Sequence, residues 1–131
     1  MGTMRYLLDT HTLLWWLFDD PKLSQRARTT IAAPENDILV SAASAWEIAT
    51  KYRIGKLPEV GDIVSQFPLY LRKARFTALD VSVDHALLAG SLPGLHRDPF
   101  DRMLIAQAKL QSVPIVTIEA IFADYGVTVL W

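Results

Sequence analysis

Short apolar runs alternate along the chain with longer segments in which hydrophobic residues recur at helical spacing. The short runs are typical of buried strands, and we expect strands over 5–9, 37–42, 77–82, 113–118 and 127–131. The longer segments predict helices over 10–20, 25–33, 41–55, 57–76, 83–92 and 99–112, a helical turn or short helix over 119–126, and a loop over 93–98. This alternation favours an α/β fold in which a parallel sheet of four to five strands is sandwiched between helices.

Residues at the helix ends support this assignment. Ser24 precedes the second helix as a capping residue, and the helix over 57–76 is expected to break near Pro68. Asp98 is expected to cap the helix that begins at Pro99, because a proline in the first helical position loses no hydrogen bond. Asp101 then lies in the first turn, near the positive end of the helix dipole.

The composition narrows the class of protein. Hydrophobic residues make up 51% of the chain and charged residues 21%, which excludes a disordered chain, and a length of 131 residues predicts one domain over 1–131. The absence of cysteine excludes a disulfide scaffold and a thiolate zinc site. The run LLWWLF is too short to span a bilayer and no signal peptide precedes it, so we expect a cytoplasmic protein. The net charge of −1 gives no overall signature of nucleic-acid binding.

Acidic residues fall where an open parallel sheet places its ligands, beyond the carboxyl ends of the strands. Asp9 ends the first strand, and Thr117 and Glu119 end the strand over 113–118. Each has a structural alternative: Asp9 can bind the backbone N–H groups of the next helix, and Glu119 can simply begin a short helix. Glu47, the one acid of its helix, can either face a cleft or form an exposed pair with Lys51 four residues later.

Taken together, the acids predict a metal site. Carboxylates that converge repel one another unless a cation lies between them, and oxygen ligands without cysteine suit Mg²⁺ or Mn²⁺. Such an ion polarises phosphate and activates water, so the pattern indicates phosphodiester hydrolysis. His11 and His96 lie near these acids as candidate ligands or general bases, with a turn or capping role as the alternative.

Four stretches resemble PIN-domain ribonucleases, specifically the VapC-type toxins of bacterial toxin–antitoxin pairs: LLDTHTLLWWL, SAASAWEIATKYRIGKL, LPGLHRDPFDRMLIAQA and IVTIEAIFADYGVTVLW. The resemblance covers essentially the whole chain. It implies a metal-dependent endoribonuclease in which Asp9, Glu47 and Asp101 bind Mg²⁺ or Mn²⁺ and position the attacking water. Asp98 matches an additional acid of the branch with RDPFDR. Glu119 stands where the family often has Asp or Asn, and is expected as a weaker ligand.

The resemblance also implies partners: an RNA substrate, a cognate antitoxin protein and a second copy in a homodimer. Arg97, Arg102 and Thr117 are candidate substrate contacts, helped by basic clusters at 51–56 and 72–75. Trp15, Trp16 and Phe18 on the first helix are candidates for an antitoxin groove, with burial in the core as the alternative. Trp46 is expected in the core.

Two other functions are compatible with parts of the pattern. One is a non-catalytic interaction domain that keeps the PIN fold. The other is a phosphoacceptor signalling domain, which also uses an acidic Mg²⁺ pocket; it needs paired acids after the first strand and a lysine near the last one, and this chain has a single acid there and no lysine after Lys109.

Overall fold

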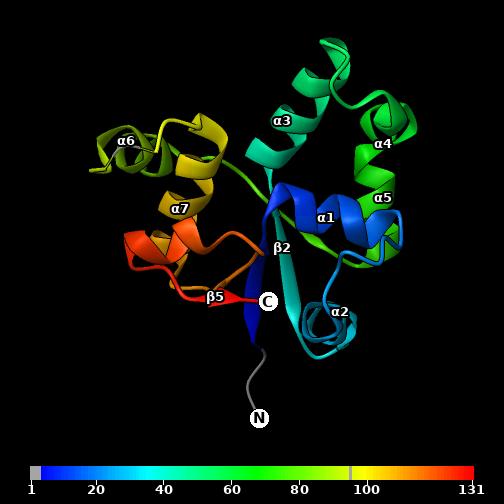
Figure 1. Ribbon diagram of the computed structural model, residues 1–131, viewed down its shortest axis with the longest axis horizontal. Helices are drawn as coiled ribbons and strands as arrows, with labels where there is room; N and C mark the ends of the chain where they lie inside the picture. Colours follow the sequence, from blue (N-terminus) through cyan, green and yellow to red (C-terminus); the bar gives the residue numbers. More distant parts are fainter. Residues whose placement is uncertain (1–3, 95) are drawn as a thin grey trace.

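The computed structural model describes residues 4–94 and 96–131, and in this part of the chain five parallel strands form one sheet in the order β3-β2-β1-β4-β5 (Figure 1). The strands are β1 Arg5–Leu8, β2 Asp37–Ser41, β3 Thr77–Leu79, β4 Ile115–Val116 and β5 Val129–Leu130. The α-helices are α1 Thr10–Leu17, α2 Gln25–Ala32, α3 Ala42–Arg53, α4 Gly61–Ser65, α5 Phe67–Ala74, α6 Val83–Ser91 and α7 Pro99–Gln111, and the 3-10 helices are η1 Pro58–Val60 and η2 Ala120–Tyr125. The expected parallel sheet between helices is confirmed. Residues 1–3 of the expected domain and Leu95 of the expected loop lie outside the described residues.

Residues near the ends of the helices and strands predicted most of the observed element boundaries. Ser24 caps α2 through a hydrogen bond from the Ala27 N–H (3.0 Å). The segment expected as one broken helix is instead η1, α4 and α5, and the last break falls at Gln66. Pro68 lies in the first turn of α5, because a proline needs no backbone N–H partner there and so begins a helix more readily than it breaks one.

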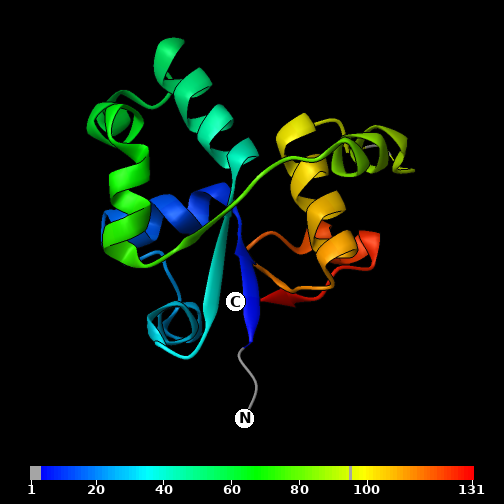
Figure 2. The same cartoon turned by 180° about the vertical axis from the view of Figure 1, so that it is seen from behind.

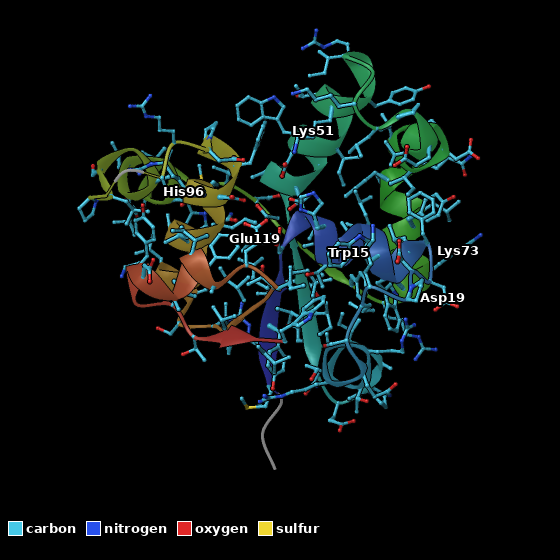
Figure 3. The ribbon with its side chains drawn as sticks, viewed as in Figure 1. Trp15, Asp19, Lys51, Lys73, His96 and Glu119 are labelled. Carbon is cyan, nitrogen blue, oxygen red and sulfur yellow. The ribbon has the colours of Figure 1, made fainter. Side chains whose placement is uncertain are left out.

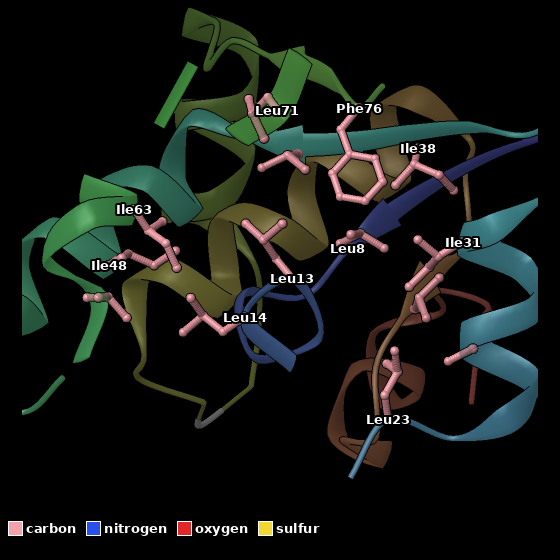
Figure 4. Close-up of a cluster of buried hydrophobic side chains, with 14 residues drawn as sticks. Leu8, Leu13, Leu14, Leu23, Ile31, Ile38, Ile48, Ile63, Leu71 and Phe76 are labelled. Carbon is pink, nitrogen blue, oxygen red and sulfur yellow. The ribbon is translucent and has the colours of Figure 1, made fainter. Parts of the chain in front are cut away.

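Side chains that alternate along the strands build two cores on opposite faces of the sheet. Leu8 and Ile38 belong to the core that α1, α2 and α5 cover, with Leu13, Ile31 and Leu71 among the helical residues (Figure 4). Their neighbours Leu7 and Leu39 belong to a second core, whose helical residues include Leu104, Ile105 and Phe122. Figures 1 and 2 show the two helical layers on either side of the strands. In the described residues, no helix is long and apolar enough to cross a membrane.

The strand order reverses between β1 and β4. From β1 the chain moves outward to β2 and β3, and it then returns to the other side of β1 to form β4 and β5. Leu8 pairs with Val116, so the next residues, Asp9 and Thr117, leave the sheet side by side. The point of reversal is where open α/β sheets bind their ligands.

One tryptophan does not lie where the sequence predicts, and two others follow one of the two predicted alternatives. Trp46 is 63% exposed and contacts Phe100 edge-on at 4.9 Å between ring centres, so its expected place in the core is wrong. Trp15 and Trp16 are partly buried against Trp131 and Phe76, respectively, which follows the core alternative for this pair. The reason is that apolar spacing identifies a helix but does not say which of its sides another element covers.

Candidate metal centre

Asp9 is a buried carboxylate at the end of the central strand. Only 2% of the residue is exposed, and its side chain accepts hydrogen bonds from the His11 backbone N–H (3.4 Å) and from the Thr117 hydroxyl (2.7 Å). It therefore caps α1, as the structural alternative predicts, while also lying at the ligand-binding edge of the sheet. Burial raises the pKa of Asp9, and the hydrogen bond from Thr117 opposes that rise.

The hydroxyl of Thr117 is hydrogen-bonded within the protein. It is fully buried, its hydroxyl donates to Asp9, and the same oxygen accepts from the Glu119 N–H (3.0 Å). The hydroxyl thus uses its single donor and one of its two acceptor lone pairs inside the protein. The hydroxyl therefore holds the Asp9 carboxylate, and the expected contact of Thr117 with substrate stays a prediction that its burial disfavours.

The start of α7 brings two more acids. Asp98 accepts hydrogen bonds from the N–H groups of Phe100 (2.9 Å) and Asp101 (3.2 Å), so the expected cap is confirmed. Asp101 Oδ2 lies 2.9 Å from His96 Nε2, and its side chain is only 14% exposed. Burial raises the pKa of Asp101 to about 6, although His96 opposes the rise.

The same shift indicates how the acids are arranged. The negative charges of Asp98, Asp9 and Glu119 each contribute to the raised pKa of Asp101. The start of α7 therefore faces the ends of β1 and β4, although these segments are far apart in the sequence. Figure 3 shows Lys51, His96 and Glu119, from three different parts of the chain, arranged around this region.

The Glu47 carboxylate is buried, and only one of its two oxygens has a hydrogen-bond partner among the described residues. The residue is 3% exposed; Oε2 lies 2.5 Å from Lys51 Nζ, while Oε1 is buried and has no hydrogen-bond partner among the described residues. The pair with Lys51 therefore forms as the structural alternative predicts, but inside the protein instead of on its surface. A buried carboxylate oxygen without a protein partner is unfavourable by itself, and it is a ligand atom that a cation can use.

Hydroxyl groups at the starts of helices hold these elements together, and the sequence analysis missed their role. Thr10 donates to Ser44 Oγ (2.9 Å) and so joins α1 to α3, and Thr12 donates to the Val116 carbonyl (2.9 Å) of β4. Ser41 caps α3 by accepting from the Ala43 N–H (3.0 Å). The available signal was a Ser or Thr within two residues of the end of each of the first two strands.

The side chains at this edge suit a hard divalent cation. Asp9, His11 and Glu119 each offer a ligand atom, and these atoms lie within 4.8 Å of one another. Glu47 Oε1 is a further oxygen without a partner, and the raised pKa values of Asp9 and Asp101 reflect carboxylates that are more favourable with a positive charge nearby. Carboxylate oxygens are the ligands that hard divalent cations prefer.

The two arginines expected at the substrate differ in availability. Arg102 directs its guanidinium to three backbone carbonyls, those of Ala89 (3.0 Å), His96 (3.0 Å) and Leu92 (2.5 Å). It therefore fastens the end of α6 to the start of α7, and its expected contact with RNA stays a prediction. Arg97 is exposed beside Asp98 in the sequence.

Comparison with known proteins agrees with this architecture. The family model described as PIN domain matches residues 6–127. Ribonuclease VapC16 of Mycobacterium tuberculosis is 48% identical over 59 residues, which cover 45% of this chain and 40% of that relative.

Solved structures extend the likeness to nearly the whole chain. VapBC2 from Rickettsia felis, crystallised with a DNA fragment from its promoter, superposes with a TM-score of 0.70 at 19% identity and covers 97% of this chain and 98% of its own. Mycobacterium tuberculosis VapC20, described as a sarcin-ricin loop cleaving toxin, superposes with a TM-score of 0.68 at 12% identity, covering 94% of this chain and 96% of its own. At these identities the likeness establishes the fold, and the family model, which spans most of the sequence, establishes the membership: the chain belongs to the PIN domain family.

Proposed function

We propose that this protein is a metal-dependent endoribonuclease, the toxin of a type II toxin–antitoxin pair. One observation carries the proposal: Asp9, His11 and Glu119 offer ligand atoms within 4.8 Å of one another at the point where the strand order reverses. The charges of Asp9 and Glu119 also act on Asp101 at the start of α7. The names of its relatives support the chemistry, since they include a ribonuclease and a toxin that cleaves the sarcin-ricin loop.

We propose Asp9, Asp101 and Glu47 as the main metal ligands, with Glu119 as a further one and Mg²⁺ or Mn²⁺ as the ion. When bound, a divalent cation offsets the negative charge that develops on a phosphodiester during hydrolysis. Asp98 has the weakest claim, because its carboxylate already accepts two backbone hydrogen bonds at the start of α7. We therefore assign it to capping, where it also contributes negative charge beside Asp101.

The residues around the acids have separable tasks in this proposal. Thr117 fixes one carboxylate oxygen of Asp9, so the side chain does not need to reorganise when substrate arrives. His96 holds Asp101 Oδ2 in the same way. The acids orient the attacking water in line with the phosphate, and the exposed Arg97 is placed to attract the RNA backbone.

The partners follow from the relatives that this chain resembles. Solved structures similar to this chain include VapBC and FitAB complexes, so we propose a cognate antitoxin protein and a toxin homodimer. Within the apolar surface expected for the antitoxin, Phe18 is 47% exposed, whereas Trp15 and Trp16 are partly buried in the core. Phe18 is therefore the member of the three that a partner can reach most fully.

The experiment that tests the function is RNA cleavage by purified protein with Mg²⁺ or Mn²⁺, compared with Asp101→Asn. We expect the variant to lose more than about 100-fold in rate, because a metal ligand is removed. Asp62→Asn, which changes an exposed acid on α4, is the matched control and should cleave like the parent. If folded Asp101→Asn cleaves as fast as the parent, the assigned site is wrong; if neither protein cleaves RNA, a non-catalytic PIN domain becomes the better description.

A further inference from the structure

The pair formed by Glu47 and Lys51 differs from an ordinary pair on a helix surface. Surface pairs at this spacing are exposed and contribute little to stability. Here the Glu47 side chain is 4% exposed and the Lys51 side chain 29%, and their charged atoms lie 2.5 Å apart. The lysine therefore extends from the last turn of α3 down to a buried carboxylate. Figure 3 shows Lys51 beside α3, above Glu119 and the upper ends of the central strands.

The ammonium of Lys51 also interacts with acids from another element. The negative charges of Asp98 and Asp101, at the start of α7, both favour its charged form. Lys51 thus lies between α3 and α7 and neutralises part of a cluster in which several carboxylates come together. This is the electrostatic task that a divalent cation performs in such a cluster.

We propose that Lys51 is a resident counter-cation of this site: its ammonium holds Glu47 in the metal-free protein and yields that carboxylate when a divalent cation binds. The proposal rests on the metal-dependent function proposed above. Glu47 Oε1 is buried without a partner, so the lysine satisfies only half of the carboxylate and leaves the other oxygen for the ion. Because like charges repel at close range, Lys51 and the ion compete, and Lys51 lowers the affinity of the protein for metal.

The proposal predicts an increase in metal affinity when the lysine is lost. We would measure Mn²⁺ binding by titration calorimetry, together with thermal unfolding with and without Mn²⁺, for the parent, Lys51→Met, Lys51→Arg and Lys56→Met. Methionine keeps most of the length of the side chain without its charge, and Lys56 is an exposed lysine of the same basic cluster, so it controls for the loss of one positive charge.

We expect Lys51→Met to bind Mn²⁺ about tenfold more tightly than the parent, the order of effect of one charge at close range in a partly buried site. Its metal-free form should unfold at a lower temperature, because Glu47 loses its partner, and Mn²⁺ should restore more stability than in the parent. Lys51→Arg and Lys56→Met should bind Mn²⁺ like the parent. A lysine with a purely structural role would lower the affinity when removed.

The outcomes separate this inference from the function on which it rests. If the parent binds Mn²⁺ and Lys51→Met binds it equally or more weakly, the counter-cation proposal is overturned while the nuclease assignment stands. If the parent and both control variants fail to bind Mn²⁺ at millimolar concentration, the metal site itself is wrong and the role of Lys51 falls with it.

Discussion

The raised pKa of Asp101 predicts how the stability of the metal-free protein depends on pH. Burial raises this pKa from 3.8 to about 6, so between these values the folded protein holds a proton that the unfolded chain releases. The contribution of Asp101 to the free energy of unfolding is therefore complete below about pH 4 and is lost as the pH rises to about 6. The full shift corresponds to about 3 kcal/mol, and because the side chain is 14% exposed we expect about 2 kcal/mol to be measured.

Asp101→Asn removes this contribution together with the interactions of Asp101 with His96 and the neighbouring acids. Urea unfolding of the parent and the variant, with a chelator present to keep both metal-free, gives their difference in unfolding free energy at each pH between 4 and 8. We expect this difference to change in favour of Asp101→Asn by about 2 kcal/mol between pH 4 and pH 6.5, and to be constant above that.

The exposed acid Asp62 provides the control, since Asp62→Asn should follow the parent at every pH. A difference between parent and Asp101→Asn that does not vary with pH would refute the reasoning, because it would mean that Asp101 titrates alike in the folded and unfolded chains. A difference that changes in favour of the parent would mean that His96 outweighs burial and lowers the pKa of Asp101.

Two further predictions concern Thr117 and Arg102, whose side-chain contacts in the structure differ from those that the sequence predicts. Thr117→Val keeps the shape of the side chain but removes the hydrogen bond to buried Asp9. In urea titrations it should lower the free energy of unfolding by about 2 kcal/mol. A change below about 0.5 kcal/mol would contradict the positioning role. Arg102→Met leaves three carbonyls without their donor and should lower the free energy of unfolding by about 2 to 3 kcal/mol. Arg97→Gln should change the free energy of unfolding by less than about 0.5 kcal/mol and weaken RNA binding at low salt. Equal losses of stability in the two variants would contradict this difference between the arginines.

The sequence alone predicted the helices and strands because the residues that determine them lie close together in the chain. Apolar runs mark the strands, and the side chains of Ser24 and Asp98 bond to N–H groups only two or three residues away. The exposure of Trp46 was not predictable in the same way. It depends on how α3 is turned relative to α7, which involves residues more than fifty positions apart.

The same distinction between local and long-range determinants applies to the candidate site. The sequence shows that Asp9 and Thr117 each follow a strand. The contact between their side chains also requires that β1 pairs with β4 in one particular register. The hydroxyl of Thr117 was therefore expected at the substrate, although sheet pairing commits it to Asp9. The carbonyl partners of Arg102 were not predictable for a similar reason, because they come from the end of α6 and the segment that follows it.

The polar partners of the acids suggest a common principle in the construction of this site. Each partner engages one carboxylate oxygen strongly: Thr117 contacts Oδ2 of Asp9, His96 contacts Oδ2 of Asp101, and Lys51 contacts Oε2 of Glu47. A carboxylate held by one oxygen keeps a fixed orientation while its second oxygen can still bind an ion. In Asp9 the second oxygen, Oδ1, also accepts a long hydrogen bond from the His11 N–H (3.4 Å). The metal-free fold consequently retains acids with raised pKa values and a buried oxygen without a partner, which lowers its stability. A substitution that relieves this strain, such as Asp101→Asn, should therefore stabilise the protein above pH 6 and inactivate it at the same time.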